Sequence, residues 1–213
     1  MTTLEWVLSR KIIAIVRGLN TEYMIPLSDA LLRGGIDLME VTFNQKEPAS
    51  FAATAEAISA VSRHMEGKML VGAGTVLTIE QLELAVNAGA KYIITPNVNP
   101  VLIRRAKSMG VNVFPGAMTP SEILAAHDAG ADFVKLFPAS DLGVSYMKAI
   151  RAPISHVKLI ATGGIGEKNA KDFLDAGAVG LGVGGGLANK KAIAAGDFSA
   201  LTEAAKALLA AIR

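Results

Sequence analysis

The stretch Asp128-Ala-Gly-Ala-Asp-Phe-Val134 carries the pattern that decides the fold of this chain. Two other stretches follow the same plan, Asn87-Ala-Gly-Ala-Lys-Tyr-Ile-Ile94 and Asp175-Ala-Gly-Ala-Val-Gly-Leu181. In each of them a glycine ends a predicted helix, and an apolar strand begins shortly afterwards. Gly34-Gly35 and Met109-Gly110 hold the same place in their own units. The repeat therefore predicts strands that alternate with helices.

The spacing of the strands indicates how they are joined. Eight apolar segments begin near residues 12, 36, 69, 91, 111, 132, 157 and 179, and the last five starts are 20, 21, 25 and 22 residues apart. Such a period is typical of parallel strands connected by right-handed helical crossovers. A doubly wound open sheet is the alternative, but Arg17-Gly18-Leu19-Asn20 is not the Gly-rich turn expected after its first strand. We predict one α/β domain over residues 1–213, a (β/α)8 TIM barrel with a short N-terminal helix over residues 2–9.

Composition narrows the classes of protein. The net charge is +2 at pH 7, aromatic residues make up 5% of the chain, and no long basic run occurs, so nucleic-acid binding is not expected. The chain has no cysteine, which excludes disulfides, thiolate metal sites and cysteine nucleophiles. No apolar run reaches the ~18 residues of a membrane helix, and the first ten residues lack the apolar core of a signal peptide. We expect a cytoplasmic protein that does not bind membranes.

Lys135 lies inside the apolar run Phe133-Val-Lys-Leu-Phe137, which reads as a buried strand. Burial disfavours the charged ammonium and lowers the pKa of a lysine. A neutral amine can attack a carbonyl carbon and form a Schiff base. The alternative is a lysine that pairs with a carboxylate, or one that reaches water from the end of its strand.

Three charged side chains are predicted at the catalytic end of the barrel, because Arg17, Glu40 and Lys135 lie late in their strands. Residues two apart in a strand share a face. If Glu40 points into the barrel, Leu38 and Thr42 do so too, and if Lys135 points inward, Phe133 and Phe137 do so too. An arginine, a glutamate and a lysine would then converge on a small volume. This arrangement indicates either a catalytic site or a buried ion-pair network.

Glycines follow the last two predicted strands, as Thr162-Gly163-Gly164-Ile165 and as Gly184-Gly185-Gly186. In this fold these two loops usually bind phosphate, since glycines let backbone N–H groups approach the anion. The alternative is that the glycines only make tight turns. Neither loop contains a lysine or arginine, and the nearest cations are Lys168 and Lys190. Backbone N–H groups are therefore expected to hold the phosphate.

No metal site and no cofactor site is predicted. His64, His127 and His156 are scattered along the chain and lack the spacing of metal ligands. The chain also lacks a Gly-x-Ser-x-Gly motif, a Walker loop and an Asp/Glu cluster suited to a divalent cation.

Seven short motifs resemble, in order, those of the KDPG/KHG aldolases. These are class I enzymes that cleave 2-keto-3-deoxy-6-phosphogluconate (KDPG) or 4-hydroxy-2-oxoglutarate (KHG) to pyruvate and an aldehyde. The resemblance covers nearly the whole chain, and it implies a (β/α)8 fold, no metal and a homotrimer. The motifs are Ile-Val-Arg17-Gly, Glu40-Val-Thr-Phe, Val-Gly-Ala-Gly-Thr75-Val, Ile-Thr-Pro96-Asn, Phe-Pro-Gly116, Val-Lys135-Leu-Phe-Pro and Ala-Thr-Gly-Gly164-Ile.

The resemblance also implies a role for each matched residue. Lys135 would be the Schiff-base lysine and Glu40 the general acid/base. Some members have an arginine four residues after this glutamate, whereas this chain has Asn44, as the related 6-phosphogalactonate aldolases do. The resemblance therefore leaves open whether the substrate is the gluconate epimer, the galactonate epimer or KHG. The other implied positions are Arg17, Thr75, Pro96, Phe137 and Thr162 around pyruvate, and Gly163, Gly164, Gly184 and Gly185 around the phosphate.

Two other functions remain compatible with these residues. One is another phosphate-binding barrel enzyme, an isomerase or a thiamine-phosphate-synthase-like transferase, that uses Glu40 as a base without a covalent lysine. The other is a barrel that binds sugar phosphates without turnover. Binding alone does not need a buried amine, so Lys135 together with Glu40 favours the aldolase.

Overall fold

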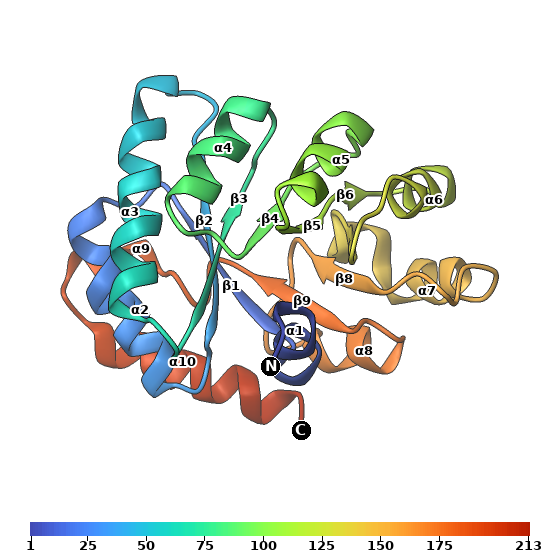
Figure 1. The fold of residues 1–213 in the computed structure, drawn as a ribbon. Coiled ribbons are helices and arrows are strands. Elements are labelled where there is room, and N and C mark those ends of the chain that lie inside the picture. Colours follow the sequence, from blue (N-terminus) through green and yellow to red (C-terminus); the bar gives the residue numbers. More distant parts are fainter.

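The computed structural model describes all 213 residues, and its centre is one sheet of nine strands (Figure 1). All neighbouring strands in it run parallel. The strands are β1 (Ile12–Arg17), β2 (Leu38–Thr42), β3 (Leu70–Gly74), β4 (Tyr92–Ile94), β5 (Asn112–Phe114), β6 (Gly116–Ala117), β7 (Val134–Leu136), β8 (Leu159–Thr162) and β9 (Gly180–Val183).

The sheet curls into a nearly closed barrel. Its strand order is β5-β4-β3-β2-β1-β9-β8-β7-β6, and the two end strands, β5 and β6, are consecutive in the chain with only Pro115 between them. Phe114 pairs with Ile94 on β4, whereas Gly116 pairs with Lys135 on β7. A proline has no N–H to donate, which suits the point where the chain changes partners. The predicted barrel is confirmed, the open sheet is wrong, and the fifth predicted strand is split in two.

Helices surround the barrel on its outer face (Figure 1). The predicted N-terminal helix is confirmed as α1, and Thr2 caps it. A short 3-10 turn leads into α2, which has no side-chain cap. No helix is long and apolar enough to cross a membrane. The helices are α1 (Thr3–Arg10), η1 (Thr21–Tyr23), α2 (Met24–Arg33), η2 (Pro48–Ser50), α3 (Phe51–His64), α4 (Ile79–Asn87), α5 (Pro100–Ser108), α6 (Pro120–Asp128), α7 (Ala139–Arg151), α8 (Ala170–Asp175), α9 (Lys190–Ala194) and α10 (Phe198–Ala211).

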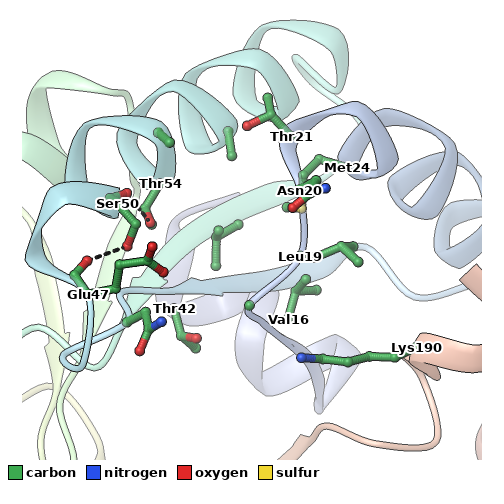
Figure 2. A pocket seen from close by; sticks show the side chains of 15 residues that line it. Val16, Leu19, Asn20, Thr21, Met24, Thr42, Glu47, Ser50, Thr54 and Lys190 are labelled. Atoms are coloured by element: carbon green, nitrogen blue, oxygen red, sulfur yellow. Dashed lines mark hydrogen bonds between the residues drawn. The ribbon is translucent and has the colours of Figure 1, made fainter. Parts of the chain in front are cut away.

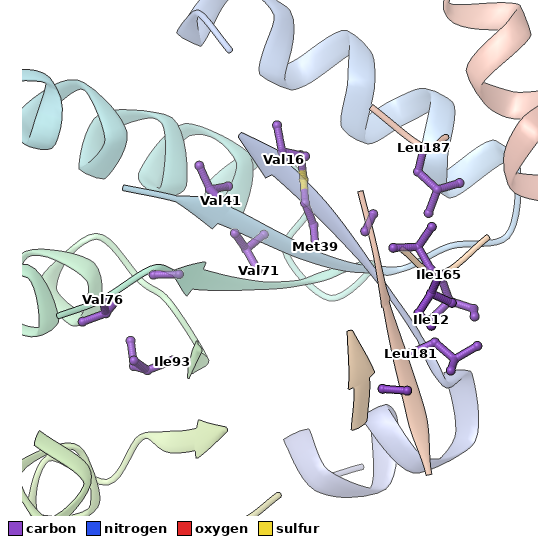
Figure 3. Close-up of a cluster of buried hydrophobic side chains, with 14 of the residues drawn as sticks. Ile12, Val16, Met39, Val41, Val71, Val76, Ile93, Ile165, Leu181 and Leu187 are labelled. Atoms are coloured by element: carbon purple, nitrogen blue, oxygen red, sulfur yellow. The ribbon is translucent and has the colours of Figure 1, made fainter. Parts of the chain in front are cut away.

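Two apolar clusters fill the two sides of the sheet. Leu38 and Phe133 belong to the inner cluster, together with Val7 of α1, which covers the end of the barrel where the strands begin. Met39 and Val41 belong to the outer cluster, between strands and helices (Figure 3). The predicted alternation is therefore confirmed on β2 and β7, and it turns Glu40 and Lys135 toward the barrel axis.

Candidate active site

A cavity of about 500 Å³ opens where the barrel strands end. All eleven residues that the sequence predicts for the site line this one cavity. Ile15, Ile165 and Gly182 also line it, and sequence reasoning missed them. Ile15 could have been found from strand alternation, because it lies two residues before Arg17 on β1. The eleven residues are Arg17, Glu40, Thr75, Pro96, Lys135, Phe137, Thr162, Gly163, Gly164, Gly184 and Gly185.

Lys135 lies at the middle of β7, and only 7% of its surface is exposed. Burial lowers the pKa of its ammonium below the usual lysine range, the negative charge of Glu40 opposes this effect, and Arg17 adds to it. Its Nζ lies 4.8 Å from the centre of the Phe137 ring. The lowered pKa favours the neutral amine that nucleophilic attack requires.

Glu40 lies on β2 and is 1% exposed. Burial raises the pKa of its carboxyl, and the positive charges of Lys135 and Arg17 act in the opposite direction. Its Oε2 has no hydrogen-bond partner within the protein. A buried carboxyl with a raised pKa and a free oxygen can both hold a proton and accept one, as general acid–base catalysis requires.

Arg17 and Thr75 form a second polar pair in the cavity. Arg17 Nη2 donates a hydrogen bond to Thr75 Oγ1 at 3.3 Å, and the guanidinium takes part in no ion pair. The planar guanidinium can bind a carboxylate through two parallel hydrogen bonds. The pair is therefore suited to the carboxylate of a small acid.

The glycines of the two loops differ in what requires them. Gly163 and Gly164 have φ angles of +96° and +69°, a left-handed backbone that favours glycine. Turn geometry alone therefore accounts for them. Gly185 has no such φ angle, and a Cβ atom there would meet nothing within 4 Å. Neither a left-handed backbone nor close packing therefore requires glycine at position 185.

Two lysines lie next to the loop after β9. A neighbouring cavity of about 570 Å³ shares Arg17, Gly184 and Gly185 with the first, and Lys190 and Lys191 line it as well. Neither lysine forms an ion pair. The sequence indicates Lys190 as the nearest cation to this loop, and in the structure Lys190 and Lys191 begin α9. Positive charge therefore lies beside the predicted phosphate site.

A separate cavity of about 570 Å³ lies between the ends of β1 and β2 and helices α2 and α3 (Figure 2). Val16 and Met24 give it apolar walls, and Thr42 lines it with an unpartnered buried hydroxyl. Asn44 lines this cavity and not the first one. None of the eleven predicted residues lies here. The residue at the arginine position of some aldolases therefore lies outside the lining of the candidate active site.

The fold and the site together define a class of enzyme. A buried lysine with a lowered pKa shares the mouth of a (β/α)8 barrel with a buried carboxyl whose pKa is raised. These are the groups that a class I aldolase uses, the amine as nucleophile and the carboxyl as acid and base. The protein is a lyase of this type.

Comparisons with known proteins give the family. The family model of KDPG and KHG aldolase matches residues 5–204. The chain is 34% identical over 185 residues to 2-dehydro-3-deoxy-6-phosphogalactonate aldolase of Escherichia coli K12, covering 86% of this chain and 87% of the relative. It is 38% identical over 194 residues to 2-dehydro-3-deoxy-phosphogluconate aldolase of Treponema pallidum, covering 90% and 89%. The chain belongs to the KDPG and KHG aldolase family.

A solved structure agrees with this assignment. The KDPG aldolase of Legionella pneumophila, with pyruvate captured at low pH as a covalent carbinolamine intermediate, matches the present fold with a TM-score of 0.87. The two chains are 28% identical, and the match covers 97% of this chain and 98% of the other.

Proposed function

We propose that this aldolase reversibly cleaves 2-keto-3-deoxy-6-phospho sugar acids, KDPG or its galactonate epimer, to pyruvate and glyceraldehyde 3-phosphate. The observation that carries the proposal is the burial of Lys135 and Glu40 in one cavity. The names of the relatives support the substrate class. An isomerase or transferase that uses Glu40 alone as a base would not need the buried amine, and family membership does not favour it.

Lys135 begins the reaction. Its neutral Nζ attacks the C2 ketone carbon of the substrate and forms a carbinolamine. Glu40 donates a proton to the departing hydroxyl, so water leaves and a protonated imine remains. The positive nitrogen of this imine can accept the electron pair of the bond that breaks next.

Glu40 then moves the protons of the cleavage step. Its carboxylate removes the proton of the C4 hydroxyl, the C3–C4 bond breaks, and the electron pair moves to the imine nitrogen. The products are the aldehyde and the enamine of pyruvate on Lys135. Glu40 returns the proton to C3, and water hydrolyses the imine to release pyruvate and the free amine.

The other residues of the cavity hold the substrate in this proposal. The pair of Arg17 and Thr75 binds the carboxylate, which fixes the ketone carbon near Lys135. Backbone N–H groups of the two glycine loops bind the phosphate at the other end. Pro96, Phe137 and Thr162 surround the pyruvate carbons. The residues that contact the phosphate are Gly163, Gly164, Gly184 and Gly185.

Trapping with borohydride tests this proposal. Pyruvate with borohydride is expected to reduce the imine, label Lys135 covalently and inactivate the enzyme, with a chelator making no difference. Intact mass and peptide mapping locate the label. Lys135→Arg is the matched control, because arginine stays protonated and cannot attack. Label on another lysine, or none, overturns the Schiff-base function.

We also propose that three copies of the chain assemble into a homotrimer. Exposed large apolar side chains lie on consecutive segments from the end of β3 to the end of β7. Contact between copies would remove this apolar surface from water. Light scattering should give three times the 22.1 kDa mass of one chain. The side chains are Leu77, Val101, Met118, Leu124 and Phe137.

A cytoplasmic location follows from the same substrate. A phosphorylated sugar acid is an anion at neutral pH, and transfer of its charge into an apolar medium is very costly. Because the substrate does not cross a membrane readily, we propose that the enzyme lies in the cytoplasm, in the compartment where the substrate is formed. Cell fractionation with an activity assay would check this location.

A further inference from the structure

Thr75 has a backbone conformation that its side chain does not favour. Its φ angle is +55°, in the left-handed region, although threonine is β-branched. Such a conformation persists only where the surroundings fix it, and it is often found at functional sites. Thr75 lines the active-site cavity and accepts the hydrogen bond of Arg17. The contacts that fix its backbone therefore bear on substrate binding.

The peptide between Thr75 and Val76 is held on both sides, because its N–H donates to the carbonyl oxygen of Ile94 at 3.3 Å and its carbonyl oxygen accepts from a chain of side-chain amides. Gln45 Nε2 donates to the carbonyl oxygen of Thr75 at 2.6 Å. Gln81 Nε2 donates to Gln45 Oε1 at 2.9 Å. Gln81 is fully buried, and its Oε1 accepts from the backbone N–H groups of Leu77 and Thr78 at 2.7 and 3.3 Å. The capping box at the start of α4 thus anchors Gln81, and Gln81 anchors Gln45.

Gln45 acts on the site without lining it. It lies between β2 and η2, outside the lining of the active-site cavity, and its hydrogen bonds join the carbonyl oxygen of Thr75 to the side chain of Gln81. The hydrogen bond of Gln45 to the carbonyl oxygen restrains the backbone of Thr75, and this backbone places the Cβ atom that carries Oγ1. Because Arg17 Nη2 donates to that oxygen, the guanidinium belongs to the same series of hydrogen bonds.

We propose that Gln45 is a positioning residue that sets the affinity of the active site for the substrate carboxylate. It holds the left-handed backbone of Thr75, and Thr75 in turn orients Arg17. The inference rests on the proposed function, because it takes the ligand of Arg17 and Thr75 to be the carboxylate of the keto acid. The competing explanation is that Gln45 only anchors its own loop to α4.

Pyruvate trapping in variants tests the role of Gln45. Gln45→Leu should raise the pyruvate concentration that gives half-maximal borohydride labelling by about 3- to 20-fold, the range that one lost hydrogen bond produces. The maximal labelling rate should stay within about twofold, because Lys135 is untouched. Methyl pyruvate, which has a ketone but no carboxylate, should bind both proteins about equally. Lys46→Ala, an exposed neighbour in the same loop, is the control and should behave as wild type.

A second variant removes the hydrogen bond between Gln81 and Gln45, which lies one residue further from Thr75. Gln81→Glu keeps the oxygen that caps α4, and in its carboxylate form it has no proton to donate to Gln45, so the labelling is measured at alkaline pH as well as at neutral pH. It should raise the half-saturating pyruvate concentration too, and the double variant with Gln45→Leu should add little, because the two residues act in series.

Three results decide the outcome. Equal weakening of pyruvate and methyl pyruvate, or additive effects of the two variants, would show that Gln45 is only a structural anchor. Wild-type affinity in both single variants overturns the inference and leaves the Schiff-base function intact. Failure of the wild-type enzyme to be labelled overturns the function and the inference together.

Discussion

The carboxylate of Glu40 fills the space into which a side chain at Gly74 would project. A Cβ atom at Gly74 would collide with Oε1 of Glu40. Two residues earlier on β3, a Cβ atom at Gly72 would collide with the ring of Tyr92 in the barrel interior. The two glycines share one face of the strand, and each leaves room for a different group. Gly74 leaves room for the candidate catalytic carboxyl of Glu40, and Gly72 leaves room for the Tyr92 ring in the core.

The same substitution at these two glycines should therefore have different effects. Gly74→Ala displaces the Glu40 carboxylate, and a misplacement of about 1 Å in a catalytic group can cost ~10²-fold in rate. Gly72→Ala overpacks the core and should lower the free energy of unfolding by about 1 to 3 kcal/mol, with kcat per folded molecule retained. Thermal unfolding and kcat of both variants check this. A fully active Gly74→Ala variant would show that the carboxylate need not lie where it does.

Glu40→Gln should separate imine formation from turnover. The amide has the shape of the carboxyl but cannot exchange protons, so the fold should persist and the pyruvate imine should still form, although slowly, while kcat falls ~10²- to 10⁴-fold. Borohydride labelling and aldehyde release, measured on the same preparation, give the two quantities. Cleavage at the wild-type rate would assign the proton transfers to another group or to water.

The pH dependence of imine formation should report the state of Lys135. Only the neutral amine attacks, so the rate should rise as the pH passes the pKa of Lys135, which burial holds below its ordinary value of 10.5. The negative charge of Glu40 stabilises the ammonium and raises this pKa. Glu40→Gln removes that charge, so the rise should move to lower pH. Glu66→Gln, an exposed carboxyl, is the control, and a shift to higher pH in Glu40→Gln would contradict the assignment.

Much of the fold and of the candidate site could be predicted from local sequence patterns. The helix-ending glycines and the apolar runs after them give the order of strands, because both signals lie within a few residues of one another. Leu38 and Phe133 are buried inside the barrel, and each lies two residues before a candidate catalytic residue. Strand alternation therefore predicts that Glu40 and Lys135 point inward as well. The barrel topology brings the ends of these strands together.

The rest depends on contacts between distant residues. The split at Pro115 follows from closure of the barrel, where β5 and β6 pair with different neighbours. The left-handed backbone of Thr75 has no signal in its own sequence, since its carbonyl oxygen bonds Gln45, which is 30 residues away in the chain, and Gln45 bonds Gln81, which is 36 residues from it. Lys190 is close to the loop after β9 in the sequence, but its place in the lining of one cavity with Arg17 depends on the position of α9 relative to β1.

Lys190 leads to the last prediction, the preference for phosphorylated substrates. Backbone N–H groups of the two glycine loops should hold the phosphate, so kcat/KM should be modestly higher for KDPG or its galactonate epimer than for 4-hydroxy-2-oxoglutarate. A favourable charge contact at such a site contributes ~0.3 to 2 kcal/mol. Lys190→Ala should therefore lower kcat/KM for the phosphorylated acids by about 2- to 30-fold and leave kcat/KM for the short acid unchanged.

The control distinguishes a local contact from a general loss of positive charge. Lys168 is exposed, follows the other glycine loop and lines neither of the two cavities that contain Gly184. Lys168→Ala should therefore leave kcat/KM unchanged for all three substrates. Equal losses in both lysine variants would indicate long-range attraction, which added salt would screen. If the wild-type enzyme cleaves 4-hydroxy-2-oxoglutarate as well as either sugar phosphate, the glycines serve only to turn the chain, and the proposed phosphate site is wrong.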